Sequence, residues 1–211
     1  ATLPALAKVT QLQLELLLTG GQRQQAVEVG LAYLRRTGID WTARPGADDV
    51  RRERTRMWQQ LGTRPIEALC SLPPMSDAQA CGTMGVLSAL MQPAWYTDDN
   101  LRAMVILRMV NMSLDYGNAD ASCVGYAWLS MILSAQGGTY DEGLRFGRMA
   151  MALAEQRGLD RFQARVYQIV GGNVLHWTQP IRNARSVVRR ALDVAHLLAA
   201  GEGDDAGHPG V

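Results

Sequence analysis

Lysine is nearly missing from this sequence. Of the 21 basic residues, only Lys8 is a lysine and the others are arginine. A phosphate-binding P-loop lysine or a Schiff-base lysine would have to be Lys8, and Lys8 lies in no glycine-rich loop. The sequence therefore gives no support to either kind of active site. The excess of arginine, alanine and glycine is typical of a bacterial genome rich in G and C.

Cysteine and long apolar runs are also scarce. Cys70, Cys81 and Cys123 are odd in number and widely spaced, so neither a disulfide framework nor a zinc site is indicated. The most apolar stretch, 101–114, is interrupted by Arg108 and is too short to span a bilayer. No signal peptide is recognisable. We therefore expect a cytoplasmic protein that does not associate with membranes.

Neither sign of charge dominates, and no catalytic motif is present. The 21 basic residues are balanced by 20 acidic ones, so no long-range field would attract nucleic acid. His176, His196 and His208 have no metal-binding spacing, and no G-x-S-x-G elbow occurs. The sequence predicts a non-enzyme that uses no cofactor and no metal and does not bind nucleic acid.

Helical spacing of apolar residues, by contrast, extends along nearly the whole chain, while β-strand patterns are weak. Glycine and proline separate the helical segments. We predict helices over 4–19, 22–36, 48 or 49 to 61, 65–71, 77–91, 97 or 98 to 116, 119–136, 140–157, 161–177 and 181–200. Together they predict a single helical domain over 1–200 and a flexible tail over 201–211. Because the chain opens at Ala1 directly in a helical pattern, we expect it to be a segment of a longer protein.

An internal repeat refines the expected fold. The first copy contains Gly20-Gly21, Ala26-Val27, Gly30 and Gly38-Ile39-Asp40, and the second contains Gly137-Gly138, Gly143-Leu144, Gly147 and Gly158-Leu159-Asp160. The paired glycines suit turns, and the small residues allow close helix packing. This pattern predicts an all-α fold of antiparallel helical hairpins, stacked as a tetratricopeptide-like array or α-α superhelix.

Three separated segments further resemble one protein family. The first is Leu34-Arg35-Arg36-Thr37-Gly38-Ile39-Asp40-Trp41, and the second is Arg64-Pro65-Ile66-Glu67-Ala68-Leu69 with Leu72-Pro73 and Met75 just after it. The third is Arg108-Met109-Val110-Asn111-Met112-Ser113-Leu114, which leads to Gly117-Asn118-Ala119-Asp120-Ala121-Ser122. In their order and their amino-acid sequences, these segments resemble the helical region of large bacterial and fungal signalling proteins. Those proteins also contain a serine/threonine-kinase-like domain, an AAA-type ATPase, a GAF domain and often a histidine kinase. The resemblance implies a linking or sensing array without catalytic motifs of its own.

Two groups of residues are candidates for binding. Aromatic side chains in the middle of the chain suggest a groove for a peptide or small molecule, namely Trp95, Tyr96, Tyr126 and Trp128. Arg182, Arg185 and Arg189 share one face of the last helix and suit either a phosphate or acidic partner, or only solvent. The central methionines suit an adaptable apolar surface or simple core filling.

Two functions follow from these features. The leading hypothesis is a protein-interaction and signal-relay scaffold that binds flanking or partner signalling domains. The alternative is a sensing domain that encloses a small apolar molecule or peptide. An internal apolar pocket would favour sensing, whereas an open groove or exposed apolar patch would favour a protein partner. Exposed repeat faces also suggest a homodimer.

Overall fold

The computed structural model describes residues 2–135 and 139–205. This part of the chain contains no β-strand, and its single bridge joins Pro74 to Asn118. The prediction of an all-α protein is confirmed. In order, the helices are α1 (Leu3–Thr19), α2 (Arg23–Arg36), α3 (Ala47–Leu61), the 3-10 helix η1 (Ile66–Ser71), α4 (Ala78–Thr97), α5 (Asp99–Tyr116), α6 (Ser122–Ala135), α7 (Tyr140–Gln156), α8 (Asp160–Asn173), α9 (Leu175–Thr178) and α10 (Ile181–Asp205).

Most helix starts in the first half lie within one or two residues of those expected, and the start of α3 and the end of α4 are the informative differences. α3 begins at Ala47, before the predicted 48 or 49, and Gly46 is its N-cap. The Asp49 carboxylate accepts a hydrogen bond from Gly46 N at 2.7 Å, so Asp49 belongs to the first turn. α4 continues past its expected end at residue 91, although Pro93 lies inside it. Proline removes one backbone hydrogen bond, but Pro93 and Ala94 are buried, and this packing favours the continued helix.

The last predicted helices also differ in extent. The segment expected as one helix over 161–177 is divided at Val174, whose φ of −120° departs from helical geometry, so that α9 follows α8 as a separate turn. α10 is longer than expected and reaches Asp205, while the flexible tail over 201–211 stays a prediction. Helix propagation gains one hydrogen bond per added residue, which favours extension from an established helix. Residues 206–211, and Gly137-Gly138 of the repeat, lie outside the described residues.

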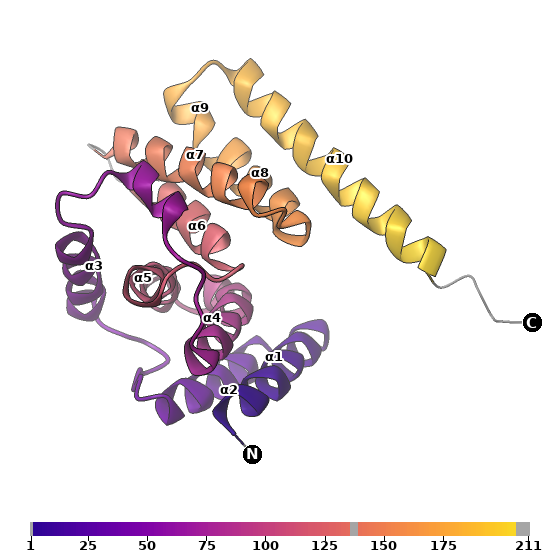
Figure 1. Ribbon diagram of the computed structural model, residues 1–211. Helices are drawn as coiled ribbons and strands as arrows, with labels where there is room; N and C mark the ends of the chain where they lie inside the picture. Colours follow the sequence, from indigo (N-terminus) through magenta and orange to yellow (C-terminus); the bar gives the residue numbers. More distant parts are fainter. Residues whose placement is uncertain (1, 136–138, 206–211) are drawn as a thin grey trace, which may run out of the picture. The chain divides into compact units, whose positions relative to one another are not determined.

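The chain divides into two compact units, residues 1–125 and 126–211, with the division inside α6. In the first unit, α1 and α2 pack against each other and against α4, and α5 packs against α4 and α3 (Figure 1). Glycine permits the close approach, since a Cβ on Gly30 would lie 2.7 Å from Leu90 Cδ1 and one on Gly82 2.8 Å from Ala7 Cβ. The prediction of one domain over 1–200 stays a prediction.

The link between α5 and α6 is fixed to the segment after η1. Gly117 has a φ of +91°, and a Cβ there would overlap the Pro73 carbonyl oxygen. Asn118 is 1% exposed, and its backbone N–H donates to Pro73 O at 2.8 Å while its side chain donates to Leu69 O at 2.7 Å. Gly117 and Asn118 therefore end α5, and Asn118 connects the end of this helix to η1 and to the segment that follows η1.

In the second unit, α8 packs against α7 on one side and against α10 on the other. Gly147 repeats the role of Gly30, because a Cβ there would lie 3.1 Å from Val170 Cγ1 of α8. Figure 1 shows α10 as the long helix beside α8. None of the helices described here is long and apolar enough to cross a membrane.

Candidate binding surfaces

The three arginines predicted to share a face of α10 do lie together. α10 turns Ala184 and Ala191 toward α8, each 6% exposed, and this fixes the rotation of the helix. The opposite side carries Arg182, Arg185 and Arg189, all exposed. They line a surface depression of ≈ 340 Å³ together with Ser186, Arg190 and one acidic residue, Asp193. None of these three guanidinium groups forms an ion pair in the described part of the chain.

A second, more apolar depression lies beside the arginines at the start of α10. Its volume is ≈ 410 Å³, and its lining includes Gly171 and Gly172 of α8, Ile181, Val188 and Arg185. Ile181 is 78% exposed. Because Arg185 lines both depressions, the apolar surface and the guanidinium groups form one continuous face. We call this surface the α10 face.

A charged cluster that sequence reasoning missed anchors α10 next to this face. Arg190 Nη1 lies 3.0 Å from Glu155 Oε1, and its guanidinium lies 4.7 Å from the centroid of the Tyr167 ring. The Tyr167 hydroxyl donates to the same Glu155 oxygen at 2.8 Å. Burial, together with this bond to an anion, raises the pKa of Tyr167 to about 12. The cluster joins α7, α8 and α10.

The four aromatic residues predicted as a groove do not form one site within either unit. Trp95 and Tyr96 belong to the first unit, whereas Tyr126 and Trp128 belong to the second. Tyr126 is 0% exposed and stacks on Phe146 with ring centroids 6.3 Å apart, so it is a core residue and not a contact for a partner. A fully buried ring lies beneath the surface where a partner would bind.

Trp95 and Tyr96 each form a cation–π contact with an arginine of the first unit. The Arg102 guanidinium lies 4.4 Å from the centroid of the Trp95 ring, and that of Arg23 lies 4.6 Å from the centroid of the Tyr96 ring. Tyr96 is still 61% exposed. The depression beside them is lined by Trp95, Tyr96 and the polar residues 97–100, and it lacks the apolar walls of a typical ligand pocket.

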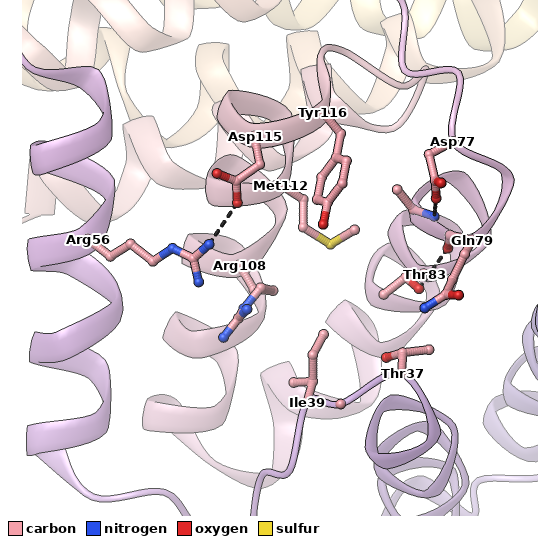
Figure 2. Close-up of a pocket in the computed structure, with 12 residues that line it drawn as sticks. Thr37, Ile39, Arg56, Asp77, Gln79, Thr83, Arg108, Met112, Asp115 and Tyr116 are labelled. Atoms are coloured by element: carbon pink, nitrogen blue, oxygen red, sulfur yellow. Dashed lines mark hydrogen bonds and ion pairs between the residues drawn. The ribbon is translucent and has the colours of Figure 1, made fainter.

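The first unit also contains a polar pocket of ≈ 200 Å³ between α3, α4, α5 and the segment after α2. Figure 2 shows Arg56 of α3 pointing toward Asp115 of α5, and the two side chains pair at 2.7 Å. Asp77 on the opposite wall accepts from Ala80 N at 2.6 Å and caps α4. Arg56, Asp115 and Asp77 of the pocket lining are therefore already bonded to other groups of the protein.

Behind this pocket lies a buried ionic cluster. Arg108 pairs with Glu53, whose side chain is only 10% exposed, and the other carboxylate oxygen accepts from Asn111 Nδ2 at 2.8 Å. The Arg108 guanidinium also lies 5.5 Å from the centroid of the Trp41 ring. The interruption of the apolar run 101–114 by Arg108 was the sequence signal for this cluster, although it did not reveal the partner.

The described residues hold no group of three histidine, cysteine, aspartate or glutamate side chains able to bind a metal ion. The pKa of the Cys81 thiol is raised, first by burial and then by the nearby carboxylates of Asp77 and Asp120. A raised pKa keeps the thiol protonated, which is the opposite of what a nucleophilic cysteine needs.

The comparisons with known proteins return nothing for this chain. No protein-family model matches it, and neither a curated protein nor a solved structure matches it.

Proposed function

We propose that this chain is a non-catalytic protein-binding scaffold of tetratricopeptide-like type, and that the α10 face binds its partner. The partner chemistry follows from the surface. An apolar side chain would enter the depression near Ile181, and flanking carboxylates would pair with Arg182, Arg185 and Arg189. The occupant is therefore an acidic amphipathic segment of another protein or domain.

The observation that carries this proposal is the continuity of apolar and cationic surface on α10. Exposed arginines alone would be consistent with a solvated face. Here they border an apolar depression and are free of ion pairs in the part of the chain that is described. Apolar contact supplies affinity at such a surface, while the charges select the partner and orient it.

A role in signal relay is the finer part of the proposal. The family resemblance of the segments around Asp40, Glu67 and Asn118 supports a position between an ATPase domain and an output domain in a cytoplasmic signalling protein. The repeated helix packing at Gly30 and Gly147 supports an array of similar hairpins. Small changes in the stacking of such hairpins would transmit the signal.

The alternative, a sensing domain for a small apolar molecule, has less support. The methionines that would line an apolar cavity are packed in the core, for example Met104, Met109 and Met149, which are 4%, 0% and 3% exposed. The pocket between α3 and α5 is small and lined by charged groups that bind one another.

The test uses a fluorescein-labelled helical peptide with leucine on one face and glutamate on the flanks. We expect binding, measured by fluorescence anisotropy, that weakens as salt rises. The double variant Arg185→Glu/Arg189→Glu should weaken binding at least about tenfold, because two attractions become repulsions. Arg148→Glu is the control, since Arg148 is an exposed arginine on α7 of the same unit and lines neither depression.

The single variant Arg189→Glu changes the net charge by the same two units as Arg148→Glu. Equal loss of binding in these two variants would contradict the proposal, because only net charge would then matter. Thermal unfolding in the presence of a metabolite and nucleotide library tests the alternative. A midpoint raised by a small molecule, with no peptide binding, would favour a sensing domain instead.

A further inference from the structure

An exposed apolar stripe runs along α1, in the first unit. Val9, Leu12 and Leu16 are 50%, 61% and 74% exposed, and Ala5 is exposed on the same line. The opposite side of the helix packs into the core through Ala7, Thr10 and Leu14. Three large apolar side chains in a row on one surface helix indicate a contact surface.

The spacing of this stripe is that of a helix that pairs with another helix. The steps from Ala5 to Val9, Leu12 and Leu16 are four, three and four residues, which is the a/d alternation of a heptad. The stripe also complements itself when two copies run antiparallel. With Val9 of each copy facing Leu12 of the other, the small Ala5 faces the large Leu16 at both ends, and the layers fill evenly.

The charges beside the stripe select the same arrangement. Lys8 and Glu15 both occupy the flank of α1 that a heptad labels g, and both are exposed. Neither makes an ion pair in the described part of the chain, and at seven residues apart they are about 10 Å from each other along the helix. In an antiparallel pair, Lys8 of one copy meets Glu15 of the other, twice by symmetry. In a parallel pair, opposite charges would not meet.

We propose that α1 is a self-association surface and that its partner is α1 of a second copy of this chain, packed antiparallel. The contact involves one helix of about 25 Å, and its area lies below that of a stable dimer. We therefore expect a weak dimer with a dissociation constant on the order of 100 µM. This proposal does not depend on the α10 face, which lies on the other unit.

The first test is sedimentation equilibrium of the chain between about 10 µM and 1 mM. We expect a monomer–dimer equilibrium that Leu16→Glu abolishes. Leu197→Glu on α10 is the matched control, because Leu197 is also 74% exposed, and it should leave the equilibrium unchanged. Both substitutions are at exposed positions, and circular dichroism with thermal unfolding checks that the helices are retained.

The second test separates the antiparallel arrangement from any other. Lys8→Glu alone should weaken dimerisation about tenfold at low salt, because two attractions become two repulsions. The double variant Lys8→Glu/Glu15→Lys should restore it, since the exchanged charges pair again between copies. A monomer at 1 mM, equal loss in the Leu197 control, or a double variant as weak as the single one would each overturn the proposal.

Discussion

Two ionic clusters, one in each unit, have similar members and different surroundings. In the first unit, the side chains of Glu53 and Arg108 are 10% and 18% exposed, and the Glu53 carboxylate binds both Arg108 and Asn111. In the second unit, the side chains of Glu155 and Arg190 are 41% and 58% exposed, and the Glu155 carboxylate binds both Arg190 and the Tyr167 hydroxyl. Solvent can replace a lost partner in the second cluster but not in the first, so burial decides what each pair contributes.

The largest expected effect comes from Glu53→Gln. The buried Arg108 guanidinium would lose its anion, and we expect the free energy of unfolding to fall by about 3–5 kcal/mol. Urea denaturation followed by circular dichroism measures this change. The double variant Glu53→Gln/Arg108→Met should be less destabilised than the sum of its single variants, because it no longer buries an unpaired charge. Additive losses would show that the two side chains are not coupled.

An intermediate effect is expected for Tyr167→Phe, which removes the hydrogen bond to Glu155 at a cost of about 0.5–1.5 kcal/mol. The pKa of Tyr167 is raised to about 12 in the folded protein, from about 10 in the unfolded chain. The unfolded chain therefore loses this proton first, and the stabilisation is complete below pH 10 and declines as the pH rises toward 12.

Unfolding of both proteins at several pH values tests this sign. The difference in free energy of unfolding between wild type and Tyr167→Phe should shrink between pH 10 and 12. A difference that grows with pH would mean that the phenolate is stabilised, and that Arg190 outweighs Glu155 at the ring.

The smallest effect is expected for Glu155→Gln, the exposed counterpart of the change at Glu53. We expect a loss of about 0.2–1 kcal/mol, because water solvates Arg190 once its partner is neutral. Raising the salt concentration to about 1 M should remove most of the difference between wild type and variant, while the effect of Glu53→Gln persists. A loss as large as that of Glu53→Gln would show that exposure does not separate the two clusters.

The helices were the predictable part of the structure. Their starts and ends follow from local chemistry, as at Asp98, whose carboxylate accepts from Leu101 N at 2.8 Å and caps α5. Two of the errors arose where tertiary packing outweighed a local signal. Pro93 lies inside α4 because the residues around it are buried. Tyr126 was expected in a groove, yet nothing local distinguishes a core tyrosine from a surface one.

The candidate surfaces were predictable only in part. The common face of Arg182, Arg185 and Arg189 follows from helical periodicity alone, because residues three and four apart lie on one side. The apolar depression beside them depends on how α8 approaches α10, and sequence spacing does not give this distance. The exposed stripe on α1 has the same pattern as a buried face, and only the packed structure shows which side of that helix is covered.

The sequence by itself determined that the chain is helical, where most helices begin and end, and which glycines allow close approach. Backbone hydrogen bonding, capping and periodicity act over a few residues, so a few residues encode them. The tertiary structure decided which charges are paired in the core, which apolar stripe is left exposed and which aromatic rings are buried. Those outcomes depend on contacts between residues such as Glu53 and Arg108, 55 positions apart, which local patterns do not specify.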